Sequence, residues 1–346
     1  MTTKKPLRSK VTFACVIFSL IVCCGCQAGP QEETAGTNTN ANFSGNELEA
    51  QASQIILQGL AGSNPQIRVN AVEIAAGTGK QQFMPGIEKL TKDDLVPVRF
   101  AAAMAIGESK YSAGKNDVAE LLKDNDENVR LAADYALVML GGSKSYTEKI
   151  RKALASDDQQ VRANAAFLLG KLGDKKSLPL LEHALKDETS DDRVRLNAIE
   201  AIARLGDETI YQKLWAMLIS AYADDRIFGV HAMRELGTAQ AKDAILTMLK
   251  DKLPEVRLVA AAELGNMGDI AGEKIVVEAL TKDISSASDP ESKGRIQTLA
   301  ALAIGQIRTP ALKRFLPELL KSESQFARLA AAKAVFQSAR GNNIGR

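Results

Sequence analysis

Few residues in this chain could carry acid–base or metal chemistry. Its 346 residues include two histidines, His183 and His231, and four cysteines, all of which lie within the first 26 residues. Neither histidine has a Cys, Asp or Glu at the spacing of a metal-binding motif, and an isolated imidazole without an orienting partner makes neither a metal site nor a general base. We therefore expect no metal, no cofactor and no catalytic residue, with His183 on a solvated surface.

The charge balance argues against a nucleic acid partner. Lysine and arginine number 44 against 42 acidic residues, a net charge of +2, whereas electrostatic capture of nucleic acid needs a clear basic excess on one face. The four basic residues among the first 25 account for this excess, so the rest of the chain is mildly acidic. A hydrophobic content of 45% is enough for a core, and the length favours two domains or a repeat array.

The first 25 residues have the order of a secretory signal peptide. Basic residues up to Lys10 are followed by an apolar run from Val11 to Val22, which is shorter than the roughly 20 residues of a membrane span. The next residues, Cys-Cys-Gly-Cys, resemble the lipobox of bacterial lipoproteins, in which a small residue precedes a cysteine that is lipidated and becomes the mature N-terminus. The resemblance implies acyl chains such as palmitate on Cys26. Cys24 is the weaker choice because bulkier residues precede it. An ordinary cleaved signal or a short anchor is the alternative.

Residues 26–46 have the composition of a flexible tether. After Cys26 the segment is rich in Gly, Asn, Thr, Ala and Gln and has almost no large apolar residues, so it cannot bury a core. Twenty such residues have an r.m.s. reach of about 25 Å, enough to hold a folded body off a lipid surface. In the lipoprotein family, a residue other than Asp after the lipidated cysteine favours the outer membrane, and Gln27 occupies that place.

The rest of the chain is a repeat array with a period of about 31 residues. A block of the form V-R-x-x-A-A-x-x-(L/I)-G recurs in nine copies. One longer step contains a polar, Pro-containing insertion near residues 282–294, which we expect to be a solvated loop. The arginines of the block, with Gln297 in their place in the eighth copy, are Arg68, Arg99, Arg130, Arg162, Arg195, Arg226, Arg257 and Arg328. We call this column the arginine ladder.

Each copy predicts two helices. With the arginine as position 0, apolar residues at −1, +3 and +7 lie on one face of the second helix, and the alanine at +3 indicates that helix backbones approach closely there. Asp126, Asp158 and Asp191 are the expected N-caps of second helices. The glycines at +11, which should end these helices in the left-handed conformation, are Gly79, Gly141, Gly173, Gly206, Gly237 and Gly268.

The pattern resembles HEAT repeats, and more closely the short phycobilin-lyase-type HEAT-like repeats, with residues 157–173 as its best copy. The predicted fold is all-α, a right-handed α-solenoid of about nine repeats over residues 47–340, with a tail at 341–346. A capping box from Ser44 to Glu47 starts it. At roughly 10 Å per stacked helix pair, the array is expected to be a curved rod of about 90 Å. Deoxyhypusine hydroxylases are HEAT-like enzymes that bind iron through His-Glu pairs, and the chain has no His-Glu dipeptide.

The arginine ladder has two interpretations. Its guanidinium groups could bind a series of anions. In HEAT-like arrays, however, Asp and Arg in these places typically pair between neighbouring repeats. We favour this structural interpretation.

The +5 column of the second helices points away from the core, about 200° around the helix from +3. In the family, second helices line the concave side, so apolar residues of this column are predicted to form an exposed strip that binds a partner. The residues predicted to bind a partner are Met104, Tyr135, Met139, Phe167, Glu200 and His231. The alternative is that the apolar ones pack across repeats. Trp215 is expected to pack in the core.

Together these features predict a lipid-anchored scaffold of the bacterial cell envelope that binds a protein or peptide partner on its concave surface. The outer membrane is favoured over the inner membrane, on the periplasmic side, and the oligomeric state stays open. One alternative is a HEAT-like enzyme, either a lyase-like handler of a chromophore or a metal hydroxylase, which the lack of His-Glu pairs disfavours. The other is a purely structural envelope component.

Overall fold

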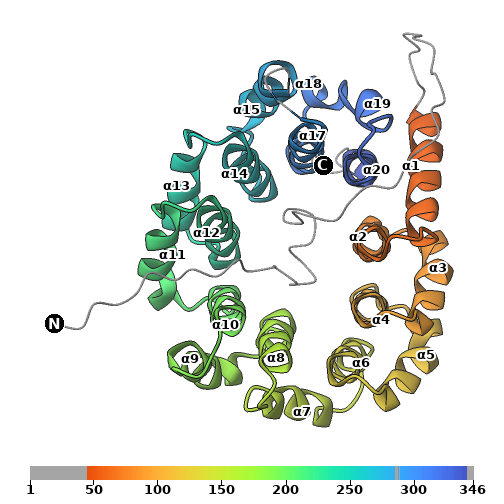
Figure 1. Ribbon diagram of the computed structural model, residues 1–346, viewed down its shortest axis with the longest axis vertical. Helices are drawn as coiled ribbons and strands as arrows, with labels where there is room; N and C mark the ends of the chain where they lie inside the picture. The colour runs from red at the N-terminus through yellow and green to blue at the C-terminus, as the bar shows by residue number, and fades with distance from the viewer. Residues whose placement is uncertain (1–44, 285–286, 288, 341–346) are drawn as a thin grey trace, which may run out of the picture.

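The computed structural model describes residues 45–284, 287 and 289–340, and helices are the only regular elements in that part of the chain. Figure 1 shows two layers around a ring, with the first helix of each repeat outside and the second inside. The outer layer comprises α1 (Gly45–Leu60), α3 (Met84–Lys89), α5 (Lys115–Glu120), α7 (Ser145–Ala153), α9 (Leu178–Lys186), α11 (Tyr211–Leu218), α13 (Ala239–Met248), α15 (Glu273–Glu278), α18 (Pro310–Lys313) and α19 (Leu316–Leu319). The inner layer comprises α2 (Pro65–Thr78), α4 (Val96–Glu108), α6 (Glu127–Met139), α8 (Gln159–Leu172), α10 (Asp192–Arg204), α12 (Ala223–Leu236), α14 (Pro254–Asn266), α17 (Pro290–Ile307) and α20 (Gln325–Arg340). The predicted all-α array of two-helix repeats is confirmed.

The ends of the inner helices follow from the residues predicted to cap them. Asp126, Asp158 and Asp191 each accept hydrogen bonds from backbone N–H groups of the first helical turn, as N-caps do. The six glycines at +11 have φ between 64° and 82°, a region that residues with a Cβ occupy only with strain. Both predictions are confirmed.

Small residues allow neighbouring inner helices to approach closely. The alanines at +3 are buried. A Cβ added to Gly107 would lie 2.6 Å from the Cα of Ala136, and one added to Gly170 would lie 2.8 Å from the Cα of Ala201. Neither distance leaves room for a side chain, so these glycines set the spacing between α4 and α6 and between α8 and α10.

The array closes on itself, so the expectation of an open rod is wrong. Helix α20 packs against α1 and α2, as Figure 1 shows. The ring of Phe336 on α20 meets that of Phe83 edge to face, with centroids 5.9 Å apart, and the Lys80 ammonium lies 5.6 Å from the Phe336 centroid. The small rotation between neighbouring repeats therefore sums to about a full turn. The sequence pattern of a single repeat does not reveal how large the total rotation of the array is.

The insertion in the eighth repeat is partly helical. Asp289 accepts a hydrogen bond from the N–H of Ser292 and caps α17, and Pro290 takes the first helical position, where its missing N–H costs nothing. The prediction of a loop throughout residues 282–294 is therefore wrong, since residues 290–294 lengthen the inner helix.

Several sequence predictions lie outside the described residues. These are the signal peptide, the lipidated Cys26, the tether up to residue 44, the Ser44 cap and the tail at 341–346. Within the described residues, no helix is both long and apolar enough to cross a membrane.

Candidate functional site

The inner face of the ring holds the residues that the sequence predicted to bind a partner. Met104, Tyr135 and Phe167 are only 6%, 1% and 5% exposed, and Met139 is half-buried against the same core. The prediction of an exposed apolar strip is therefore wrong. These side chains instead pack between neighbouring inner helices, which is the alternative of packing across repeats.

Tyr135 takes part in a polar contact on this inner face. Its hydroxyl donates to Glu108 Oε1 at 3.4 Å, and the same oxygen pairs with Lys171 Nζ at 2.7 Å. Burial, followed by the charge of Glu108, raises the pKa of Tyr135. Because the three residues come from α6, α4 and α8, this contact links three consecutive inner helices.

Glu200 belongs to a chain of alternating charges on the next three inner helices. Arg204 pairs with Glu200 at 2.8 Å and also with Glu235. Arg234 in turn pairs with Glu235 at 2.6 Å and with Glu263 at 2.8 Å. Burial raises the pKa of Glu200, while the charge of Arg204 opposes that shift. Each of these three carboxylates contacts at least one of the two guanidinium groups, so the ion pairs join α10, α12 and α14.

His231 has an orienting partner after all, and the expectation of an isolated imidazole is wrong. Its Nδ1 lies 2.5 Å from Glu263 Oε1 on the next inner helix, a whole repeat away in sequence, where no local motif could reveal it. Burial disfavours the ionised Glu263, but the charges of His231 and then Arg234 outweigh it and lower the pKa to about 2. The Nε2 atom is buried. A general base must reach its substrate, so this geometry suits an ion pair between α12 and α14 better than catalysis. His183 is exposed, where the sequence placed it.

A pocket of about 230 Å³ lies beside these charges, between α10, α12, α14, α17 and α20. Lys333 of α20 lines it, with its stem lying over Gly77 of α2. Burial raises the pKa of Glu73 on α2 to about 8, and burial lowers that of Lys333, while each charge partly opposes the shift of the other. Glu73 and Lys333 thus interact across the seam where the ring closes. No group of three or more His, Cys, Asp or Glu in the described residues could hold a metal ion.

The arginine ladder joins consecutive repeats. Arg226 Nε and Nη2 donate to the two oxygens of Asp251 at 2.7 and 3.0 Å, and its Nη1 donates to the carbonyls of Ser220 and Ala221. The pairs, with their shortest distances, are Arg68–Asp93 (2.8 Å), Arg99–Asp124 (2.8 Å), Arg162–Asp187 (3.2 Å), Arg226–Asp251 (2.7 Å) and Arg257–Asp283 (2.7 Å). Each carboxylate belongs to the following repeat, so every pair fastens one repeat to the next.

Three places in the ladder have serine where other repeats have aspartate, and one of them, Ser322, follows Gln297 and donates to its Oε1 at 2.6 Å. Ser156 follows Arg130 and Ser220 follows Arg195. Each serine hydroxyl accepts the backbone N–H two residues further on, as the ladder aspartates do, so the turn is kept while the carboxylate is lost. Both arginines still donate to backbone carbonyls. Arg328, in the last repeat, does the same.

The sequence did not predict an exposed apolar patch on the edge of the ring. The patch, which we call the edge patch, consists of Trp215 (37% exposed), Ile219 (68%), Tyr222 (67%) and Leu253 (36%). The expectation that Trp215 packs in the core is wrong, because its neighbour Leu214 takes the buried side of α11 and Trp215 instead stacks on Tyr211, with centroids 6.5 Å apart.

A sequence signal for this patch lies in the N-cap column. Tyr222 and Leu253 occupy the N-cap positions of α12 and α14 with the same extended backbone as Asp126, but neither side chain caps its helix. A non-capping residue there costs about 0.5–2 kcal/mol, and the mostly exposed Tyr222 gains little packing in return. The N-cap column holds Asn64, Asp126, Asp158 and Asp191, but also Leu95, Tyr222 and Leu253. Two of the three apolar exceptions, Tyr222 and Leu253, belong to the edge patch, whereas Leu95 lies at the start of α4 outside it.

Arg226 brings the two loops of the edge patch together. The Ser220 and Ala221 carbonyls that it contacts directly precede Tyr222, and Asp251 lies in the loop that ends at Leu253. Both loops therefore contact one guanidinium.

Comparison with known proteins gives the family but little more. Residues 53–146 and 147–228, about half of the chain, match the family model described as HEAT repeats. No curated protein matches the sequence. Among solved structures, human deoxyhypusine hydroxylase in complex with glycerol is 17% identical over 85% of this chain and 97% of that chain, with a TM-score of 0.34. The complex of CpcE and CpcF of phycocyanin lyase from a Nostoc species is 18% identical over 74% and 96%, with a TM-score of 0.38. Importin beta is 15% identical over 84% and 47%, with a TM-score of 0.35.

Proposed function

The chain belongs to the HEAT-repeat family, and from that premise we propose that it is a lipid-anchored adaptor, without catalytic activity, that binds a protein partner at its edge patch. HEAT repeats generally mediate protein–protein interaction. The observation that carries the proposal is the edge patch itself, where exposed apolar side chains occupy positions that capping residues hold in other repeats.

The composition of the edge patch suits a protein interface. Tryptophan and tyrosine are enriched among the residues that dominate binding energy in interfaces, and clustered exposed apolar side chains mark interaction sites. The inner face is a poorer candidate, because its carboxylates already have cationic partners and its pocket of about 230 Å³ lies below the roughly 300–1,000 Å³ of typical ligand sites.

The direction of the chain favours a soluble partner over lipid at this patch. Every outer helix runs toward the edge that carries the loops to the inner helices, and the edge patch lies on that edge. Helix α1 is an outer helix and therefore begins at the opposite edge. A lipid on Cys26, at the end of a tether reaching about 25 Å, would thus hold the ring with the edge patch turned away from the membrane. We place this membrane as the outer membrane of a bacterium, on its periplasmic side.

The adaptor role is tested by a photocrosslinking residue introduced at Tyr222 in intact cells. The expected result is one crosslinked protein of defined mass, which is absent with the crosslinker at Asp157, an exposed loop residue of another repeat. Tyr222→Asn should abolish a subsequent pull-down of that protein while the chain stays folded, because the new cap contributes about 1 kcal/mol against the packing lost. Equal crosslinking from both positions would refute the assignment of the patch.

The anchor is tested separately by acylation. Cys26→Ala is expected to abolish incorporation of labelled fatty acid, and undiminished labelling would refute the anchor without touching the patch. Bound metal or visible absorbance in the purified protein would favour the enzyme alternative instead.

A further inference from the structure

Arg130 presents a guanidinium edge that other repeats use to hold a carboxylate. Its Nη1 donates to the carbonyls of Asp124 and Asn125 at 2.7 and 3.0 Å, as the Nη1 of Arg99 does in its own loop. In Arg99 the Nε and Nη2 atoms hold Asp124 at 2.8 and 3.0 Å. In the described part of the chain, no carboxylate pairs with the corresponding edge of Arg130, since Ser156 stands where an aspartate would.

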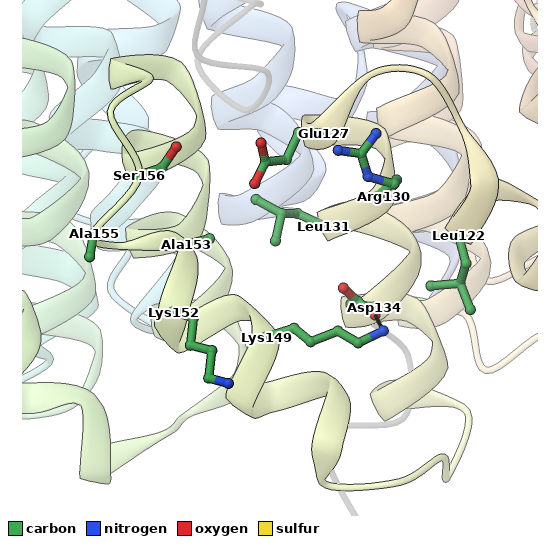
Figure 2. A pocket seen from close by; sticks show the side chains of 10 residues that line it. All are labelled: Leu122, Glu127, Arg130, Leu131, Asp134, Lys149, Lys152, Ala153, Ala155 and Ser156. Atoms are coloured by element: carbon green, nitrogen blue, oxygen red, sulfur yellow. Dashed lines mark hydrogen bonds and ion pairs between the residues drawn. The ribbon is translucent and has the colours of Figure 1, made fainter.

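A pocket of about 420 Å³ occupies the place of that missing contact. Figure 2 shows Arg130 on one side of it, Ser156 on the opposite wall, and Lys149 and Lys152 along α7. At roughly 30 Å³ for each water in the liquid, the pocket has room for about 14 waters or a small organic molecule. The loop that supplies a carboxylate in other repeats therefore leaves an open space in this one.

The charges around the pocket leave a basic excess. Lys149 Nζ lies 3.4 Å from Asp134 Oδ1, so these two groups compensate each other. Burial raises the pKa of Asp134, and the charges of Lys149 and Arg130 oppose that shift. Arg130 and Lys152 form no ion pair with described residues, and the remaining acidic group of the pocket is the exposed Glu127. Two cations thus face one acidic side chain.

The rest of the lining is apolar. Leu122, Leu131 and Ala153 contribute to the walls, with Leu131 and Ala153 buried in the core. A ligand that fits this surface combines one anionic group with a small apolar body. A planar carboxylate matches the guanidinium fork in two parallel hydrogen bonds, and the chain itself shows this geometry at Arg68, Arg99 and Arg226.

We propose that the pocket between α6 and α7 binds a small apolar carboxylic acid, whose carboxylate completes the arginine ladder at Arg130. This site is independent of the edge patch and of the adaptor role proposed for it. The ligand fastens α6 to the loop after α7 from outside, as the ladder aspartates do from within the chain.

The test is isothermal titration calorimetry of the full chain with hydrocinnamate, its uncharged amide and phenylphosphonate. We expect hydrocinnamate to bind with a Kd below about 1 mM. The amide should bind at least about tenfold more weakly, because a charge-assisted bidentate contact is lost. Arg130→Gln should lower the affinity for hydrocinnamate by a similar factor, and the fold should tolerate it because Gln297 holds this column in the eighth repeat.

The matched control is Arg195→Gln, which changes the other ladder arginine that faces a serine but lies outside the pocket. This variant should bind hydrocinnamate as the parent chain does, and thermal unfolding of both variants shows whether each is folded. Equal affinities of the acid and the amide, undiminished binding by Arg130→Gln, or no heat from the parent chain would each overturn the proposal. Tighter binding of phenylphosphonate than of hydrocinnamate would overturn the choice of carboxylate.

Discussion

Removing the Asp251 carboxylate is expected to destabilise the fold more than the same change at any other aspartate of the arginine ladder. Arg226 and Asp251 are the least exposed pair, with side chains 6% and 8% exposed. Loss of one partner from a buried pair leaves the other charge uncompensated, which costs about 3–5 kcal/mol. Asp251 Oδ1 also accepts the N–H of Leu253 at 2.9 Å, a contact that adds about 1 kcal/mol. We therefore predict that Asp251→Ala lowers the free energy of unfolding by about 4–6 kcal/mol.

A more exposed pair of the same ladder gives the comparison. The side chains of Arg257 and Asp283 are 20% and 28% exposed, so solvent screens their attraction and Asp283→Ala should cost about 1 kcal/mol. Urea unfolding followed by circular dichroism measures each change, with constant m values showing that the same surface unfolds. Asp243→Ala, on the exposed side of α13, should stay within about 0.5 kcal/mol of the parent.

The refuting result is a cost for Asp251→Ala no larger than that for Asp283→Ala, since burial would then not govern the strength of the ladder. A double change, Arg226→Met with Asp251→Ala, separates the buried charge from lost packing. It should cost less than the sum of the two single changes, because it removes the uncompensated guanidinium as well.

Three further outcomes follow from the inner face and the seam. The pKa of Glu73 is raised to about 8 in the fold. The stability that its neutral form supplies is therefore present below pH 4.5 and lost as the pH rises through about 8. The melting temperature of Glu73→Gln should be higher than that of the parent chain above pH 8 and similar to it near pH 4. The pKa of Glu263 is lowered to about 2, so the stability that its ionised form supplies is present above pH 4.5 and lost toward pH 2. Glu263→Gln should lower the melting temperature at pH 7, and the difference between variant and parent should vanish in acid. Phe336→Ala removes the seam contact with Phe83. It should lower the free energy of unfolding by about 3–5 kcal/mol and increase the radius of gyration measured by X-ray scattering. Phe167→Ala, the control, should destabilise the fold without that increase.

Features repeated within one period could be predicted from the sequence, because their physical cause is local. A glycine at +11 ends its helix through its own φ, and Asp126 or Asp158 caps its helix through its own first turn. The pairing of Arg and Asp between repeats likewise recurs at every step where both residues are present. At each of these positions, every repeat that has the residue makes the same short-range contact.

Features that depend on the sum of all repeats could not be predicted in this way. Tyr135 is buried because the inner helices on either side of α6 pack against it, a contact between repeats that its position within one repeat does not reveal. His231 gains Glu263 from the next inner helix, a contact that requires the packing between repeats. The exposure of Trp215 had a partial signal in the sequence, because nearby Tyr222 departs from the capping pattern, but Leu95 departs from it in the same way outside the edge patch.

Closure of the ring also bears on the adaptor role that we propose. An open solenoid needs terminal repeats with polar outer faces, and it offers its concave side to partners. Here α20 covers the side of α1 and α2 that an open array would have to protect, so the first and last repeats cap each other. Met104, Tyr135 and Phe167 on the concave side are buried between neighbouring inner helices. For the adaptor role that we propose, this burial favours the edges of the ring, where Tyr222 and Leu253 of the edge patch occupy the N-cap positions of α12 and α14 without capping them.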